Sequence, residues 1–366
     1  MTWILHQGDV LEKLKQIEGE TINCCVTSPP YWGLRDYGVD GQLGLEQTPE
    51  EYTVKMVKVF REVRRVLRDD GTLWLNMGDS YASGGKGGGG SFMDLRKDGA
   101  WSGRSSLTGW KSAPPGLKHK DLVGIPWRLA FALQADGWYL RSDIIWSKPN
   151  PMPESVTDRP TKSHEYIFLL VKSPRYYYDA NAIREPSTYL QPNSPESIKS
   201  PYGQGFTRRA NNGVGFGHGT DKEMRERDTV RGSIGVIKNP LNSARRSGNK
   251  ERKINVSGRL NTHVGSSIPW EGATRNKRTV WNIATKPFSE AHFAVFPPEI
   301  PEICIKAGCP EQGWVLDPFA GSGTTLMVAA NLWRNAIGIE INPEYCELIK
   351  RRMEGLETNL FEMGGR

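Results

Sequence analysis

Residues 22–77 follow the order strand, helix, strand, and this order constrains the fold more than any other feature of the sequence. The apolar run "INCCV" (22–26) predicts a buried strand, and "TLWLNM" predicts a second one. Between them, "TPEEYTVKMVKVFREVRRVLRDDG" predicts a helix with Thr48 as N-cap, Pro49 in the first position and Glu51 completing a capping box. A unit of this kind implies a largely parallel sheet.

The same order returns near the C-terminus, with a glycine-rich turn between strand and helix. "WVLDPFAGSGTT" predicts a strand ending in Asp317, then a turn with Gly321 and Gly323 that brings the backbone close to a ligand. The next strand, "AIGIE", ends in Glu340, 23 positions after Asp317, where a carboxylate can accept from both hydroxyls of a ribose. The third glycine of a dinucleotide motif and the lysine of a phosphate-binding loop are missing. A ribose ligand without pyrophosphate therefore fits better than NAD or ATP, and a plain tight turn is the alternative.

Further segments extend the alternation of strands and helices. "ILHQGDVLEKL" predicts a short strand and a helix start, with Asp9 either as N-cap or as acceptor for an adenine amine if this strand lies beside "AIGIE". "GIPWRLAFALQADG" predicts a helix, and "YLRSDIIWSKP" and "HEYIFLLVKS" predict strands, the second opening with His164 and Glu165 as a structural polar pair. We therefore expect an α/β fold with a doubly wound, mostly parallel sheet.

One segment, residues 186–280, carries the whole basic excess of the chain. It holds 17 Lys and Arg against 7 Asp and Glu, a net +10, whereas the full chain is +7 and the remainder is therefore −3. Low apolar content and many Gly, Asn, Ser and Arg predict an inserted, loop-rich module facing a polyanion, with a merely solvated basic loop as the alternative. The expected parts are residues 1–185, with a Gly-rich loop at 83–116, then 186–280 and 281–366.

The cysteines and the hydropathy pattern limit the class of protein. The five cysteines are Cys24, Cys25, Cys304, Cys309 and Cys346. They lie in apolar or helical contexts without paired metal spacing, so we expect reduced thiols in a cytoplasmic protein, with no disulfide framework and no metal site. The N-terminal stretch turns polar within a few residues and no apolar run is long enough to span a bilayer, so neither a signal peptide nor a membrane span is expected.

The stretch "TSPPYW" follows the first predicted strand and does not resemble an ordinary turn. Two prolines fix their φ angles, remove two N–H donors and leave carbonyl oxygens free to accept. Ser28 adds a hydroxyl before them, and Tyr31 and Trp32 add flat rings after them. The result suits a planar ligand that carries an N–H donor, although packing is the commoner role for a residue such as Trp32.

Together these motifs resemble the S-adenosylmethionine-dependent DNA amino-methyltransferases. "SPPY" (28–31) matches the family tetrapeptide that holds the target amine, and "DPFAGSGTT" (317–325) matches its cofactor motif. Their order along the chain resembles the β-type permutation of this family. The resemblance covers about 270 residues, all but the basic insertion, and includes blocks such as "SDIIWSKPNPMPE" and "HFAVFPPEIPEICIKAG".

The resemblance implies roles for individual residues. The target-base pocket would consist of Ser28, Pro29, Pro30 and Tyr31. The S-adenosylmethionine site would consist of Asp9, Asp317, Phe319, Gly321, Gly323, Thr324 and Glu340. The segment 186–280 would recognise double-stranded DNA, with Arg208, Arg209, Arg245, Arg246, Arg252, Lys253, Arg275, Lys277 and Arg278 available for phosphates and base edges. The loop at 83–116 would either close over DNA or be a tolerated insertion.

The expected reaction is methylation of an exocyclic nitrogen on a base turned out of the duplex. Ser28 Oγ and the Pro29 carbonyl would accept the hydrogens of the amine, and Tyr31 would stack on the base, worth about 1–3 kcal/mol. Ring-carbon methylation needs a Pro-Cys motif, and none occurs. In the family, serine at the first motif position accompanies cytosine N4 more often than adenine N6, so cytosine N4 is favoured and adenine N6 is the alternative.

Three other interpretations stay open at the level of sequence. A non-catalytic DNA-binding protein of the same fold disagrees with the intact motifs, and an NAD-type oxidoreductase disagrees with the incomplete glycine pattern. A methyltransferase acting on RNA is not excluded by fold or pocket. No nuclease motif is evident, so any restriction activity would require a separate endonuclease, and neither the recognition site nor the choice between monomer and homodimer can be read.

Overall fold

A computed structural model gives the fold of the chain. It describes residues 1–34, 38–82, 94–95, 101–102, 113, 116–187, 274–286 and 296–364, with side chains described to residue 356. Most of the Gly-rich loop 83–116 and of the basic segment 186–280 lies outside the described residues. The chain divides into one unit formed by Met1–Glu185 with Asn276–Arg366 and another formed by Pro186–Arg275. The expected roles of these parts stay predictions.

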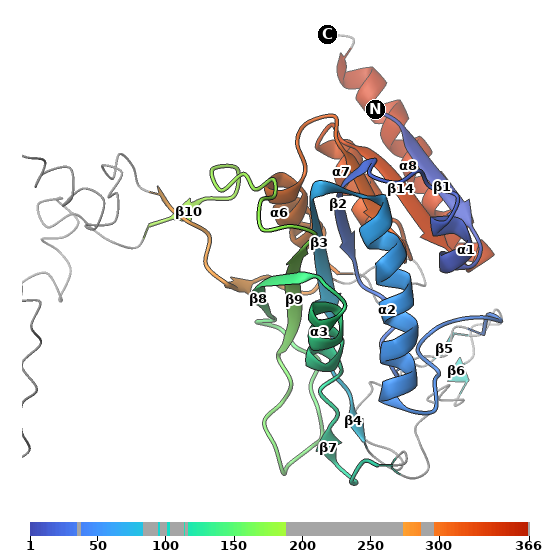
Figure 1. Cartoon of the computed structure of the whole chain (residues 1–366), viewed down its shortest axis with the longest axis vertical. Coiled ribbons are helices and arrows are strands. Elements are labelled where there is room, and N and C mark those ends of the chain that lie inside the picture. Colours follow the sequence, from blue (N-terminus) through green and yellow to red (C-terminus); the bar gives the residue numbers. More distant parts are fainter. Residues whose placement is uncertain are drawn as a thin grey trace, which may run out of the picture. The chain divides into compact units, whose positions relative to one another are not determined.

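An eight-stranded sheet organises the first unit (Figure 1). Its order is β1 (Trp3–Gln7), β14 (Asn335–Glu340), β13 (Trp314–Asp317), β2 (Ile22–Thr27), β3 (Leu67–Met77), β9 (His164–Val171), β8 (Tyr139–Ser147) and β12 (Val280–Asn282). All neighbouring pairs are parallel except those of β9, which runs antiparallel to both β3 and β8. The expected doubly wound, mostly parallel α/β sheet is confirmed.

Helices cover both faces of this sheet because the strand side chains alternate. Cys25, Leu73 and Phe168 pack with α1 (Val10–Leu14), α2 (Pro49–Val66) and α3 (Ile125–Ala135) in one core. Their strand neighbours Cys24 and Trp74 pack into a second core with α6 (Glu299–Gly308), α7 (Thr324–Asn331) and α8 (Pro343–Gly364). Apolar side chains on both faces of a strand are what a doubly covered sheet requires.

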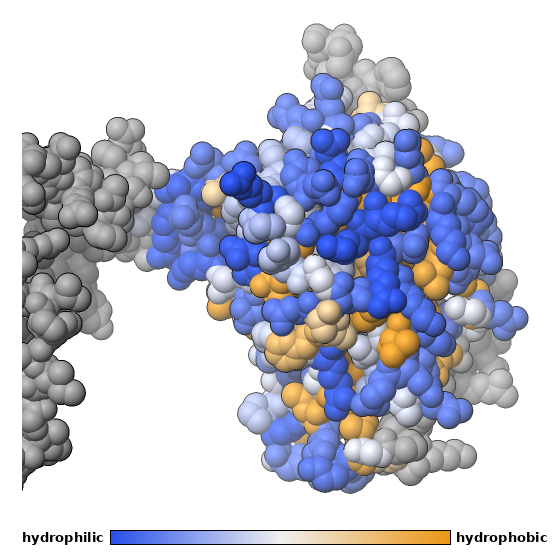
Figure 2. Space-filling model, viewed as in Figure 1, coloured by the Kyte–Doolittle hydropathy of each residue, from blue (hydrophilic) through white to orange (hydrophobic). Residues whose placement is uncertain are grey.

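Helix α2 follows the sequence prediction at its start and departs from it at its end. Thr48 Oγ1 accepts from the Glu51 N–H, whereas the Glu51 carboxylate accepts from the Gln47 N–H, one residue before the expected partner. The helix ends at Val66, and β3 begins at once, with a register shift against β2 that contains Asp69-Asp70-Gly71. The face of the molecule that Figure 2 shows is mostly hydrophilic, with separate apolar patches.

Short two-stranded pairs complete the described structure. They are β4 (Tyr81–Ala82) with β7 (Asp121–Leu122), β5 (Asp94–Leu95) with β6 (Trp101–Ser102), and β10 (Glu185–Pro186) with β11 (Thr274–Arg275). All five cysteines are buried and free. Among the described residues, no helix combines the length and the apolar character needed to cross a bilayer.

Candidate active site

The two sequence motifs meet at the carboxyl edge of the sheet. From β2 the chain passes through α2 to β3 on one side, and from β13 it passes through α7 to β14 on the other side. The strand order therefore reverses between β2 and β13, and open α/β sheets bind their ligands at such a point. There Thr27 Oγ1, at the end of β2, donates to Asp317 Oδ1, at the end of β13, over 2.7 Å.

Asp317 is a buried brace at this reversal. Its Oδ1 also accepts from the Phe319 N–H at 3.1 Å, and its Oδ2 accepts from Thr325 Oγ1 at 2.7 Å. Burial raises the pKa of the carboxyl to about 6, although the hydroxyls of Thr27 and Thr325 act in the opposite direction. Both carboxylate oxygens are thus engaged within the protein, and they tie the start of the glycine-rich turn to both strands.

Glu340 ends β14 and is the acceptor that faces the glycine-rich turn. Its Oε2 accepts from the Gly321 N–H and its Oε1 from the Asn342 N–H, each at 2.8 Å. The residue is only 9% exposed, and burial raises its pKa to about 7. Each oxygen keeps further lone-pair capacity beyond one backbone partner. This carboxylate is therefore preorganised to accept from two neighbouring hydroxyls.

The other residues expected in the cofactor site have contacts of their own. Phe319 lies partly buried against the core, and Thr324 Oγ1 pairs with Ser322 Oγ at 3.2 Å. Gly323 has φ +78°, and a Cβ there would lie 2.9 Å from the Ile349 side chain. The close packing of the turn against α8 therefore requires a glycine at this position, independently of any need to leave room for a ligand.

Of the two roles that the sequence left open for Asp9, the structure shows the N-cap. Its Oδ1 accepts from the Leu11 and Glu12 N–H groups, so it is the N-cap of α1. The strand before it, β1, does lie beside β14, with Gln7 opposite Glu340. Asp9 thus sits near Glu340 at the same sheet edge. Two carboxylates at the ends of neighbouring strands fit a nucleoside-type ligand such as S-adenosylmethionine.

On the other side of the reversal, the tetrapeptide 28–31 opens onto a polar network. Ser28 Oγ donates to the Tyr31 hydroxyl at 3.1 Å, and the Tyr31 hydroxyl donates to Glu165 Oε2 at 2.8 Å. Asn76 Nδ2 donates to the Tyr31 oxygen at 2.7 Å and to Glu165 Oε2 at 2.9 Å. Lys148 Nζ donates to Glu165 Oε1 and lies 4.2 Å from the centre of the Trp146 ring.

Charge and burial set the protonation of this network. Burial alone would raise the pKa of Glu165, but the adjacent Lys148, together with hydrogen bonds from Asn76 and Tyr31, lowers it below its ordinary value. Burial and the charge of Glu165 raise the pKa of Tyr31 far above its ordinary value. Glu165 is therefore an anion and Tyr31 a neutral phenol at physiological pH.

The prolines and the second aromatic ring of the motif shape the pocket. Pro29 is buried, and the Pro30 carbonyl accepts from the Tyr52 hydroxyl at 2.9 Å. Trp32 is fully buried and donates to the Glu46 carbonyl at 2.9 Å, so packing is confirmed as its role. Gly78 lies against the Tyr31 ring, where a Cβ would come within 2.6 Å of Cε2.

Sequence reasoning missed three residues of this network, namely Asn76, Lys148 and Glu165. The prediction of a structural pair between His164 and Glu165 is wrong, because Glu165 points into the network while the His164 ring packs edge-on against Tyr166 at 5.4 Å. Adjacent strand residues face opposite sides of a sheet, and this alternation was the available signal. The antiparallel direction of β9 then places Glu165 at the carboxyl edge.

Only three of the residues expected to bind DNA are described. Arg278 Nε pairs with Glu185 Oε1 at 2.5 Å, and Lys277 Nζ lies 5.9 Å from the centre of the Trp281 ring. Arg275 lies in β11. The other six, Arg208, Arg209, Arg245, Arg246, Arg252 and Lys253, lie outside the described residues. No group of three or more His, Cys, Asp or Glu side chains suited to a metal ion occurs within the described part of the chain.

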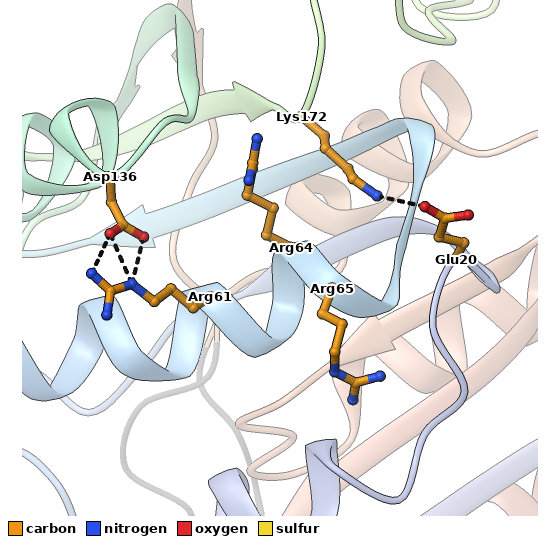
Figure 3. A pocket seen from close by; sticks show the side chains of 6 residues that line it. All are labelled: Glu20, Arg61, Arg64, Arg65, Asp136 and Lys172. Carbon is orange, nitrogen blue, oxygen red and sulfur yellow. Dashed lines mark hydrogen bonds and ion pairs between the residues drawn. The ribbon is translucent and has the colours of Figure 1, made fainter.

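A basic hollow lies at the opposite edge of the sheet, beside the end of α2 (Figure 3). Arg61 forms a fork with Asp136, and Lys172 pairs with Glu20 at 3.3 Å. Arg65 points away and pairs with Glu62 at 2.8 Å. Because Arg61, Arg65 and Lys172 have anionic partners in the protein, we assign the hollow to bracing α2 against α3 and the strand ends.

Comparisons with known proteins agree with this geometry. The model of the DNA methylase family (N6_N4_Mtase) matches residues 22–351. The type II methyltransferase M.Cfr9I of Citrobacter freundii is 40% identical over 98% of this chain and 90% of its own. The type II methyltransferase M.SmaI of Serratia marcescens is 42% identical over 94% of this chain and 89% of its own.

Solved structures show the same fold at lower sequence identity. The PvuII DNA methyltransferase, described as cytosine-N4-specific, superimposes with a TM-score of 0.55 at 17% identity, over 96% of this chain and 86% of its own. A putative DNA modification methylase from Thermus thermophilus, crystallised with S-adenosyl-L-methionine, gives a TM-score of 0.50 at 21% identity, over 95% of this chain and 92% of its own.

Proposed function

We propose that this chain, which belongs to the DNA methylase family of S-adenosylmethionine-dependent amino-methyltransferases, methylates the exocyclic N4 of a cytosine turned out of double-stranded DNA. One observation carries the proposal. The Thr27–Asp317 hydrogen bond holds a pocket suited to an amine directly beside a turn suited to a nucleoside cofactor. When the amine and the cofactor are held at adjacent strand ends, their proximity and orientation supply most of the acceleration of the methyl transfer.

On the cofactor side, Glu340 would hold the ribose of S-adenosylmethionine. Its two oxygens are fixed by backbone N–H groups of Gly321 and Asn342, so they need no rearrangement before accepting hydroxyl hydrogens. Asp9 and Phe319 lie at the same edge and would line the adenine and ribose positions. Asp317 would contribute indirectly, because its hydrogen bonds with Thr325 and the Phe319 N–H hold the glycine-rich turn in place. When bound, the cofactor supplies an electrophilic methyl group on a sulfonium.

On the base side, Ser28 and Pro29 would activate the amine. The exocyclic nitrogen is a poor nucleophile because its lone pair is delocalised into the ring. Ser28 Oγ and the Pro29 carbonyl would accept its two hydrogens, turning the nitrogen toward tetrahedral geometry with its lone pair free. Tyr31 would stack on the base with its hydroxyl anchored by Glu165 and Asn76, worth about 1–3 kcal/mol. The lone pair would form the N–C bond as the S–C bond breaks, S-adenosylhomocysteine would leave, and the nitrogen would release one proton to water, so no covalent intermediate on the protein is required.

The preference for cytosine rests on the serine at position 28, and adenine N6 is the alternative target of the same pocket. The basic segment 186–280 would recognise the DNA sequence, because it alone carries the positive excess of the chain. Since the relatives are named type II methyltransferases, a separate restriction endonuclease is the expected partner in the cell. The five buried, free thiols suit a reducing compartment such as the bacterial cytoplasm.

Nucleoside mass spectrometry of plasmid DNA tests the proposal directly. DNA from cells expressing the protein should contain N4-methylcytosine, and a Ser28→Ala variant should lose it because one acceptor of the amine is gone. If N6-methyladenine appears instead, the target base is adenine rather than cytosine, and the proposed site residues remain supported. Methylation of RNA with unmodified DNA would refute the proposed substrate. Sequencing of the modified plasmid then gives the recognition site.

A further inference from the structure

We propose that Glu165, acting through Tyr31, fixes Ser28 as a hydrogen-bond acceptor and so makes the pocket select a base with an exocyclic amine over its carbonyl counterpart. This inference rests on the proposed function and deepens it, because it names the residue that decides which bases the pocket accepts. It applies to cytosine against uracil and equally to adenine against hypoxanthine.

The direction of each hydrogen in the network follows from Glu165. An ionised carboxylate accepts and cannot donate. Its Oε1 is taken by Lys148, and its Oε2 receives the Tyr31 hydroxyl at 2.8 Å. The single hydrogen of Tyr31 is thereby committed to Glu165. The Tyr31 oxygen is then an acceptor only.

The same logic passes from Tyr31 to Ser28. The Ser28 hydroxyl lies 3.1 Å from the Tyr31 oxygen and donates to it, which commits the single hydrogen of Ser28 as well. Asn76 Nδ2 lies 3.5 Å from Ser28 Oγ, at the outer limit of a hydrogen bond, but 2.7 Å from the Tyr31 oxygen. Asn76 therefore supports the Tyr31 end of the chain and leaves Ser28 Oγ with lone pairs to offer.

A pocket that offers only acceptors discriminates by chemistry, since an exocyclic amine donates two hydrogens while a carbonyl at the same ring position donates none. Facing Ser28 Oγ and the Pro29 carbonyl, a carbonyl base would leave buried acceptors opposed to one another without a shared hydrogen. Such a mismatch weakens binding by on the order of tenfold to hundredfold. Ser28 on its own could rotate its hydrogen toward either kind of base. Glu165 removes that freedom.

Replacing Glu165 by Gln should reverse the direction of the hydrogen bonds between Ser28, Tyr31 and residue 165 without changing the size of the side chain. Lys148 would retain the Gln carbonyl oxygen, because an ammonium needs an acceptor. The Gln amide nitrogen would then face the Tyr31 hydroxyl and Asn76 Nδ2, which both donate to Glu165 Oε2 in the wild type, and neither would find an acceptor there. Tyr31 would then donate to Ser28, and the Ser28 hydrogen would turn toward the base. Glu165 is thus a positioning residue, and its effect requires the Tyr31 hydroxyl.

The experiment measures the dissociation constants of the full chain for paired DNA duplexes that carry the recognition site. One duplex holds the target base, and the other holds its carbonyl counterpart, uracil for cytosine or hypoxanthine for adenine. We expect Glu165→Gln to reduce the preference for the amine by about tenfold or more and to slow single-turnover methylation. In a Tyr31→Phe background the same change should alter the preference by less than about twofold.

Glu154→Gln is the matched control. Glu154 has the same side-chain exposure as Glu165, 15%, and a comparable ion pair, with Arg159 at 2.6 Å. The Glu154→Gln variant should keep the wild-type preference for the amine base. The inference is overturned if Glu165→Gln keeps that preference, if it alters the preference equally without the Tyr31 hydroxyl, or if Glu154→Gln mimics it. If the wild-type protein methylates neither cytosine nor adenine in the plasmid assay, the proposed function is refuted before the binding experiment is done. The two failures are therefore distinguishable.

Discussion

Replacing Glu340 by Gln should remove a pH dependence from the stability of the protein. Burial at the end of β14 raises the pKa of this carboxyl from 4.5 to about 7. The unfolded chain would release the proton near pH 4.5, whereas the folded chain keeps it until about pH 7. Between these values the unfolded state binds fewer protons, so the free energy of unfolding falls as the pH rises. The favourable contribution is complete below pH 4.5 and is lost above pH 7.

The size of this effect follows from the displacement of the pKa. At about 1.36 kcal/mol for each pH unit, a pKa moved from 4.5 to about 7 disfavours the ionised carboxylate by about 3 kcal/mol in the folded protein. The Gln side chain has no proton to release. Wild type should therefore lose about 3 kcal/mol more than Glu340→Gln between about pH 4.5 and pH 8. The neighbouring Asp317, with a pKa of about 6, contributes a similar slope to both proteins.

Urea unfolding at several pH values measures the difference. Glu347→Gln is the control, since Glu347 lies on α8 with its side chain 67% exposed. Parallel pH profiles for wild type and Glu340→Gln would refute the reasoning, because they would show a carboxylate that water solvates normally. Binding supplies a second test. If ribose hydroxyls require the ionised form, affinity for S-adenosylhomocysteine should fall up to about tenfold from pH 8 to pH 6 in wild type, and should be pH-independent in the variant.

Three further substitutions test individual contacts. Gly78→Ala places a Cβ 2.6 Å from the Tyr31 ring, so single-turnover methylation should fall by roughly a hundredfold while the melting temperature changes little. Gly308→Ala places a Cβ 2.4 Å from Thr72 Oγ1 in the core, so urea unfolding should show a loss of about 1–3 kcal/mol. Thr27→Val removes a donor from Asp317, so unfolding should show a loss of about 1–3 kcal/mol that is larger at pH 8 than at pH 5.

The parts of the fold that depend on local pattern were predictable. Strands β2, β13 and β14 and helix α2 are marked by apolar runs, caps and turns within a few residues of each element. These features need only short-range information, which the sequence carries explicitly.

The missed parts depend on strand direction and on long-range packing. Nothing near residue 164 indicates that β9 runs antiparallel, yet this direction brings Glu165 to the carboxyl edge. The requirement for Gly323 arises from Ile349 on α8, which a reading of the turn alone cannot supply. The early end of α2 at Val66 likewise depends on the pairing of β3 with β2.

The strand order also explains how chemistry and recognition can be separated in this chain. Ser28 and Asp317 lie far apart in the sequence, but their strands β2 and β13 are neighbours, and Thr27 closes the gap between them. The basic segment, 186–280, follows Glu185 and ends at Val280, the first residue of β12. That strand is the last of the sheet, with β3, β9 and β8 between it and β2. Changes in the length or sequence of 186–280 therefore enter at the far edge. The proposed recognition segment can therefore vary without moving Ser28 and Pro29, the acceptors that we propose for the amine.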